Sequence, residues 1–187
     1  MLELAGRLGL PDLAYVAPRA PARSWWPESF LAPLAANEPW LSSALAAVAD
    51  AVDDLVAAGI GVECIEIMGF SQGACLALEY AARAGRRFRG VTGLSGALLG
   101  TGEAAGPPSE ALYGHAPKRF DYPGTLDGVP VFLGCHRHDP HIPLLRVEES
   151  AAAFERLGAA VTSRIYPGRG HGLVEDEIAY LRGKMNV

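Results

Sequence analysis

The sequence of 187 residues contains only three cysteines, and it has neither a long apolar run nor a dense basic tract. Three is an odd number, and each cysteine stands in an apolar segment, where a free thiol behaves as a small buried hydrophobic group. This usage predicts a reducing compartment and hence a cytoplasmic protein. The three residues are Cys64, Cys75 and Cys135.

The other two absences exclude whole classes of protein. No segment reaches the ~18 apolar residues of a membrane span, and residues 1–7 lack the basic start and apolar run of a secretory signal. The net charge is −5, from 16 Lys and Arg against 21 Asp and Glu, and basic side chains cluster only at residues 83–89. We therefore expect no membrane span and no nucleic-acid partner.

Strand-like and helix-like patterns alternate along most of the chain. Short apolar runs predict strands at residues 13–17, 62–68, 89–96, 130–135 and 159–166. Longer patterns predict helices at residues 1–9, 41–58, 74–83, 142–157 and 174–184. This alternation favours an α/β fold, with a mostly parallel sheet that is flanked by helices on both faces.

Half of the residues are hydrophobic, which suffices to fill the core of one domain over residues 1–187. Two irregular segments interrupt the pattern. Residues 19–39 are broken by prolines but hold Trp25 and Trp26, which are either core anchors or walls of a ligand pocket. Residues 100–128 form a glycine- and proline-rich excursion, which is either a lid or pocket wall, or a solvated insertion.

The segment Gly69-Phe70-Ser71-Gln72-Gly73 stands between a predicted strand and a predicted helix. Its Gly-x-Ser-x-Gly pattern is that of a nucleophile elbow, a sharp turn that presents a serine hydroxyl above a sheet. We expect both glycines to be required, because so tight a turn leaves no room for Cβ atoms. On this pentapeptide alone, an ordinary turn with a helix-capping serine is the alternative.

Reactive side chains follow three of the predicted strands: Ser71, Asp139 and His171. Because the carboxyl ends of parallel strands meet at one edge of a sheet, these side chains are expected to lie together. Their order along the chain is the order of a Ser-Asp-His triad in an α/β-hydrolase, where imidazole activates the serine and the carboxylate orients the imidazole. Asp121 and Asp127 also lie between Ser71 and His171, but both fall in the excursion.

The run from His136 to His141 contains three histidines and Asp139, which also suggests metal ligands. It is similar to the His-x-His-x-Asp-His motif of metallo-β-lactamase-like hydrolases. However, Asp139 stands one position early and Pro140 takes the place of the motif's aspartate. We therefore predict no metal site, and we interpret the run as a polar loop that carries the triad acid. No cofactor is expected, because acyl transfer through a serine needs none.

Three motifs, in this order, resemble the phospholipase/carboxylesterase family of α/β-hydrolases, which includes acyl-protein thioesterases and lysophospholipases. They are residues 69–74, His136-x-x-Asp139-x-x-Ile142-Pro143 and Tyr166-Pro167-Gly168-x-Gly170-His171. The resemblance covers the chain from about Val16 onward and implies an α/β-hydrolase fold. It also implies that the substrate is a small carboxylic ester, a thioester or a lysophospholipid.

The resemblance assigns roles to single residues. It implies that Ser71 is the nucleophile, Asp139 the acid, His171 the base, and the backbone N–H of Gln72 an oxyanion donor. Residues expected to contact substrate are Trp25, Trp26, Phe70, Leu98 and Ile142. The oligomeric state, including a homodimer, stays open.

One departure from the family pattern affects both fold and function. The family opens with a strand and a His-Gly-rich loop that supplies a second oxyanion N–H, and the sequence has neither before Leu13. We expect an N-terminally shortened sheet, completed by an upstream segment, by direct pairing of residues 13–16 with the elbow strand, or by a partner chain. Loss of one oxyanion donor reduces the stabilisation of the transition state by roughly 2.7–4 kcal/mol. A catalytically weak or inactive hydrolase-fold protein that binds a small ligand or partner near Trp25 and Trp26 is therefore the alternative function.

Overall fold

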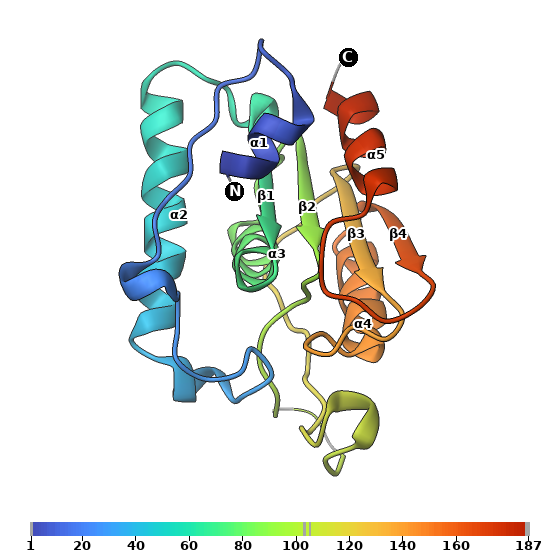
Figure 1. Ribbon diagram of the computed structural model, residues 1–187. Helices are drawn as coiled ribbons and strands as arrows, with labels where there is room; N and C mark the ends of the chain where they lie inside the picture. The colour runs from blue at the N-terminus through green and yellow to red at the C-terminus, as the bar shows by residue number, and fades with distance from the viewer. Residues whose placement is uncertain (1, 103, 105, 186–187) are drawn as a thin grey trace.

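The computed structural model describes residues 2–102, 104 and 106–185 of the chain. At its centre lies a sheet of four parallel strands in the order β1-β2-β3-β4 (Figure 1). The strands are β1 (Glu66–Phe70), β2 (Gly90–Leu94), β3 (Pro130–His136) and β4 (Ala160–Tyr166). Because all four run in one direction, the loops that follow them meet at one edge of the sheet.

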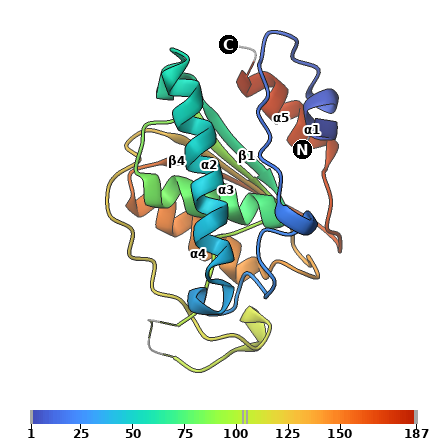
Figure 2. The same cartoon turned by 90° about the vertical axis from the view of Figure 1, so that its left-hand side faces the viewer.

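Helices cover both faces of this sheet, as the alternating pattern predicts. They are α1 (Leu2–Leu8), α2 (Trp40–Ala57), α3 (Gln72–Ala84), α4 (Leu144–Arg156) and α5 (Glu175–Met185). Helices α1 and α5 lie on one side, and α2, α3 and α4 lie on the other (Figure 2). None of the helices in the described residues is long and apolar enough to cross a membrane.

Two apolar clusters hold the layers together. The larger one fills the space between the sheet and helices α2, α3 and α4. The smaller one joins α1 and α5 to the opposite face through residues such as Leu8, Phe132 and Leu181. Strand β2 is buried along its whole length because it has a strand on each side and helices on each face.

The excursion at residues 100–128 is fastened to α3 by a buried carboxylate. Glu79 has no exposed surface, and its Oε2 atom accepts hydrogen bonds from Tyr122 Oη at 2.8 Å and from the N–H of Leu99 at 3.1 Å. The ammonium of Lys118 lies 3.6 Å from the same oxygen. Burial lowers the pKa of Lys118, and the Glu79 charge opposes that shift.

Two sequence predictions are wrong on the side of the molecule that precedes β1. Residues Leu13–Ala17 form no strand, and Tyr15 and Val16 are 41% and 56% exposed, so this segment neither pairs with β1 nor is buried. Residues Val62–Cys64 form a single 3-10 turn, and β1 begins only at Glu66. Cys64 is therefore exposed, whereas Cys75 and Cys135 are buried as expected, and all three thiols are free.

Candidate active site

The turn between β1 and α3 holds Ser71 in a strained backbone conformation, with φ 54° and ψ −124°. Positive φ is uncommon for a residue with a side chain, and the surrounding hydrogen bonds must maintain it. The N–H of Ser71 donates to the Leu94 carbonyl at the end of β2 at 2.9 Å. The Ser71 carbonyl accepts from the N–H groups of Ala74 and Cys75, so the elbow is tied both to the sheet and to the helix.

Glycine is required at one of the two expected positions in this turn. A Cβ atom at Gly69 would stand 2.0 Å from the backbone oxygen of Gly73. Because the clash is with backbone, no change of side-chain rotamer can remove it. A Cβ atom at Gly73 would meet nothing within 4 Å, so the expectation of crowding there is wrong. The sequence analysis missed Gly96, where a Cβ atom would lie 2.4 Å from Ala74 Cβ. The close contacts at the elbow thus lie where β1 meets the start of α3 and where the segment after β2 meets α3.

The structure brings the three reactive residues together at the carboxyl edge of the sheet. His171 Nε2 lies 2.8 Å from Ser71 Oγ, and His171 Nδ1 lies 2.8 Å from Asp139 Oδ2. Ser71 follows β1, Asp139 follows β3 and His171 follows β4. A serine, a base in hydrogen-bond reach of it and a carboxylate that orients the base form the arrangement required for nucleophilic catalysis.

The Asp139 carboxylate is buried, with 1% exposure, and it has several hydrogen-bond donors. Its Oδ1 atom accepts from the backbone N–H groups of His141 at 2.8 Å and Ile142 at 3.1 Å. The Cys135 thiol donates to Oδ2 at 3.8 Å, and the hydroxyl of Tyr113 donates to the Asp139 carbonyl. Burial and the Asp139 charge raise the pKa of Cys135 to about 12, so this thiol stays protonated beside the carboxylate.

Two aromatic rings flank the His171 imidazole, whose side chain is only 17% exposed. The Phe70 ring lies 5.3 Å from it, and the His141 ring meets it edge-on at 4.8 Å. These contacts restrict rotation of the imidazole while both of its nitrogens hold their partners. The role of His141 is not evident from the sequence, where it is one of three histidines in a polar loop.

The Gln72 side chain joins the elbow to the segment with the two tryptophans. Its Oε1 atom accepts from the N–H of Trp25 at 2.9 Å, and its Nε2 group donates to the Trp26 carbonyl at 3.0 Å. Sequence reasoning considered only the backbone of Gln72. That backbone N–H begins α3, where the first N–H groups have no acceptor within the helix and can bind an anion.

The expected substrate-contact residues differ in exposure. Trp26, Leu98 and Ile142 are 2%, 0% and 3% exposed, so they are core residues in this structure. The N–H of Leu98 donates to the buried Ser150 hydroxyl, which fixes the backbone rather than a ligand site. Only Phe70 and Trp25 keep part of their surface accessible. Within the described part of the chain, no three His, Cys, Asp or Glu side chains gather so that they could hold a metal ion.

Comparison with known proteins identifies the family of the chain. The model of the family described as Phospholipase/Carboxylesterase matches residues 10–186. The chain belongs to the phospholipase/carboxylesterase family. It therefore shares a family with esterases and thioesterases, and its fold is that of the α/β-hydrolase esterases.

Individual relatives and solved structures resemble the chain to different extents. A crystal structure of a phospholipase/carboxylesterase from Dyadobacter fermentans is 38% identical, has a TM-score of 0.86, and matches 100% of this chain and 82% of its own. Acyl-protein thioesterase 1 of Gibberella zeae is 30% identical over 131 residues, or 68% of this chain. The chain spans only about half of that relative's length, 51%. The crystal structure of the Arabidopsis thaliana protein SOBER1 shares the fold, with a TM-score of 0.67 and 18% identity. That match covers 98% of this chain and 89% of SOBER1.

Proposed function

We propose that the chain hydrolyses small carboxylic esters, thioesters or lysophospholipids through an acyl-enzyme on Ser71. The observation that supports this reaction is the pair of 2.8 Å hydrogen bonds that link Ser71 to His171 and His171 to Asp139. The strained φ of Ser71 and the buried, multiply hydrogen-bonded Asp139 support it further. Neither feature is needed for a turn that merely connects a strand to a helix.

The reaction divides into two transfers of the acyl group. His171 Nε2 takes the hydroxyl proton as Ser71 Oγ attacks the carbonyl carbon, and the oxyanion lies near the Gln72 N–H at the start of α3. The bond to the leaving group then breaks, and that group receives the proton from His171. Water, activated by the same imidazole, attacks the acyl-enzyme, so that the carboxylic acid leaves and Ser71 regains its proton.

A series of p-nitrophenyl esters of increasing acyl length tests the proposal. We expect turnover by the wild-type chain and its loss, by about four orders of magnitude or more, in Ser71→Ala. A matched control is Ser95→Ala, at a buried serine after β2 that lies outside the proposed triad. If folded wild-type protein hydrolyses none of the esters, the alternative of an inactive hydrolase-fold binding protein becomes the better account. Activity retained in Ser71→Ala would also overturn the proposed mechanism.

A further inference from the structure

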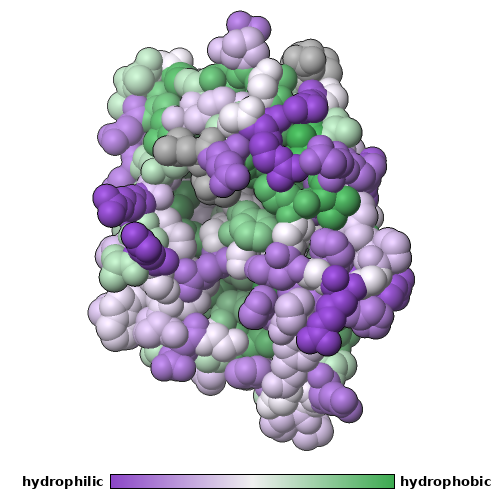
Figure 3. All heavy atoms as spheres, in the orientation of Figure 1, coloured by the Kyte–Doolittle hydropathy of each residue, from purple (hydrophilic) through white to green (hydrophobic). Residues whose placement is uncertain are grey.

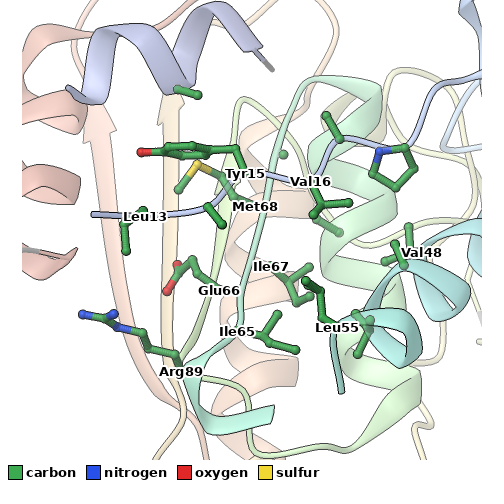
Figure 4. Close-up of a pocket in the computed structure, with 18 of the residues that line it drawn as sticks. Leu13, Tyr15, Val16, Val48, Leu55, Ile65, Glu66, Ile67, Met68 and Arg89 are labelled. Atoms are coloured by element: carbon green, nitrogen blue, oxygen red, sulfur yellow. The ribbon is translucent and has the colours of Figure 1, made fainter. Parts of the chain in front are cut away.

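Two hollows on the described part of the molecule differ in character. A groove of about 540 Å³ follows the open edge of β1, opposite Leu13, Tyr15 and Val16 (Figure 4). Its lining is mostly apolar, and apolar surface gathers around a hollow beside α1 (Figure 3). The other hollow, of about 520 Å³, adjoins the triad acid and is lined on two sides by Arg137 and Arg169. We call this second hollow the basic pocket.

Three segments of the chain build the basic pocket. The loop after β3 supplies Arg137 and His138, and the loop after β4 supplies Arg169. The tip of the excursion supplies Tyr113, and the first turn of α4 completes the lining. The excursion lies beyond the carboxyl ends of the strands, where these loops also meet (Figure 1). The pocket is therefore at the same edge of the sheet as Ser71.

Backbone hydrogen bonds join the two loops that carry the arginines. The N–H of Arg137 donates to the Tyr166 carbonyl at 2.8 Å, and the N–H of His138 donates to the Gly168 carbonyl at 3.2 Å. Arg169 follows directly in the same loop. The backbone beside both guanidinium groups is thus held in place without a ligand, which reduces the entropic cost of binding one ligand with both.

The tip of the excursion is attached to the loop of the triad acid. The hydroxyl of Tyr113 donates a hydrogen bond to the Asp139 carbonyl. Burial and the Asp139 charge raise the pKa of Tyr113, whereas the positive charge of Arg169 opposes that shift. The Arg169 charge therefore acts on a side chain that another segment contributes to the pocket.

Acidic side chains do not balance the charges of the basic pocket. Guanidinium groups stay protonated, and within the described residues neither Arg137 nor Arg169 has an ion pair, whereas Arg164 pairs with Asp176 at 2.6 Å. The carboxylate in the lining, Asp139, is 1% exposed and is already hydrogen-bonded to the triad imidazole and to two backbone N–H groups. Two unbalanced positive charges therefore line this pocket, in a chain whose net charge is −5.

We propose that the basic pocket binds a phosphate group. The planar fork of a guanidinium matches two phosphate oxygens, and two guanidinium groups balance the charge of a phosphate dianion. The ring of His138 adds a further hydrogen-bonding group in the same lining. A volume of about 520 Å³ exceeds that of a phosphate ion, so the pocket also has room for the group to which an esterified phosphate is attached.

Two sources supply such a group: a phosphate-bearing ester that is a substrate of the triad, and a free phosphate ion. Arg137 stands two positions before Asp139, and Arg169 stands two positions before His171. This proximity to the triad favours the substrate as the source. That source rests on the proposed function, whereas phosphate binding itself is measured without turnover.

Nuclear magnetic resonance of the arginine Nε–H groups measures binding of glycerol phosphate to the whole chain at constant ionic strength. We expect saturable shifts of the Arg137 and Arg169 signals, competition by inorganic phosphate, and no shift with glycerol. The double variant Arg137→Gln/Arg169→Gln is expected to bind at least about tenfold more weakly. Arg87→Gln/Arg156→Gln removes the same charge at exposed positions before β2 and β4, and should bind as the wild type does.

Hydrolysis of hexanoylglycerol phosphate and of hexanoylglycerol distinguishes the two sources, because these esters differ only in the phosphate. If the substrate carries the phosphate, the wild type should prefer the phosphate ester in kcat/KM by about tenfold or more. The double variant Arg137→Gln/Arg169→Gln should lose most of that preference. Saturable phosphate binding with the same preference in both proteins assigns the pocket to the free ion.

The proposal fails if the folded wild-type chain does not bind glycerol phosphate, or if binding weakens equally in the two double variants. Circular dichroism establishes that each variant is folded. A chain that hydrolyses esters without binding glycerol phosphate would retain the proposed function and overturn the phosphate site. A chain that binds glycerol phosphate but hydrolyses no ester would support the site and contradict the proposed function.

Discussion

The two edges of strand β1 differ in how completely they are built. On the β2 edge, the strand is paired along its length, and Asp139 and His171 arrive from the loops after β3 and β4 to meet Ser71. On the other edge lies a groove of about 540 Å³, bounded by an exposed segment without strand pairing. The elbow stands where these two regions meet.

The contacts that position Ser71 are therefore complete although the sheet has an open edge beside β1. Contacts with the end of β2 and with α3 hold the backbone of Ser71: the N–H bond to Leu94, the close approach of Gly96 to Ala74, and that of Gly69 to Gly73 within the elbow itself. On the groove side, the segment with the two tryptophans contacts the elbow through the Gln72 side chain. We therefore expect changes on the β2 side to have the larger effects.

The largest effect is expected for Asp139→Asn. An amide at this position stabilises the wrong imidazole tautomer and no longer stabilises the imidazolium, so kcat for the esters is expected to fall by roughly 10³–10⁴ at neutral pH. Asp121→Asn, at an exposed acid of the excursion paired with Arg119, is the matched control and should leave kcat unchanged. Equal losses in the two variants would contradict the assignment of the acid.

A pair of glycine substitutions compares a crowded position of the elbow with an open one. Gly69→Ala places a Cβ atom against backbone, so the free energy of unfolding is expected to fall by roughly 3 kcal/mol or more. Gly73→Ala places a Cβ atom at a helical position with no atom within 4 Å, so the free energy of unfolding should rise by up to about 1 kcal/mol. Urea unfolding monitored by circular dichroism measures both, and similar losses would show that Gly73 is as closely packed as Gly69.

The β2 side also contains a buried acid that lacks the partners of Asp139. Burial raises the pKa of Glu177 to about 7, and its hydrogen bond from the Val174 N–H lowers it only in part. The folded state therefore binds the proton of Glu177 more tightly than the unfolded state does. The contribution of the protonated side chain to the free energy of unfolding is fully present below about pH 4 and is lost as the pH rises through 7.

Glu177→Gln keeps the acceptor for the Val174 N–H but cannot ionise. We expect the variant to exceed the wild type in unfolding free energy by about 2–3 kcal/mol at pH 8, with the difference disappearing near pH 4. Thermal unfolding across this pH range provides the measurement, with Glu175→Gln, at an exposed position, as the control. A difference that does not change with pH would show that ionisation of Glu177 is not its cause.

The smallest effect is expected on the groove side, for Gln72→Ala. This variant retains the backbone N–H but loses the side-chain bonds to Trp25 and Trp26, each worth about 1 kcal/mol. We expect kcat/KM to fall about tenfold and tryptophan fluorescence to shift as the segment loosens. Unchanged kcat/KM with a shifted fluorescence would confine the role of Gln72 to the fold.

Much of the fold follows from local pattern. The parallel α/β layers could be predicted because each strand and helix has a distinct run of side chains, and the positions of Ser71, Asp139 and His171 after strands are enough to place them at one edge. The segment at Leu13–Ala17 shows the limit of that reasoning. Its composition suits a strand, but a strand also needs a neighbour, and no local pattern shows whether one is present.

Contacts between distant residues account for the other differences. The Gln72 bonds to Trp25 and Trp26 join positions more than forty residues apart, so spacing in the sequence does not reveal them. The same holds for Glu79, which fastens the excursion to α3. Gly73 satisfies the motif, yet the space beside it depends on what lies along the free edge of β1.

Labelling with a fluorophosphonate tests the central claim most directly, because only a serine activated by a neighbouring base reacts rapidly and stoichiometrically. Mass spectrometry of the folded chain is expected to show one adduct per molecule, on the peptide that contains Ser71, and none in Ser71→Ala. Asp139→Asn should react far more slowly. Folded wild-type protein that stays unlabelled, or that carries its adduct on another residue, would contradict the proposal that Ser71 is an activated nucleophile.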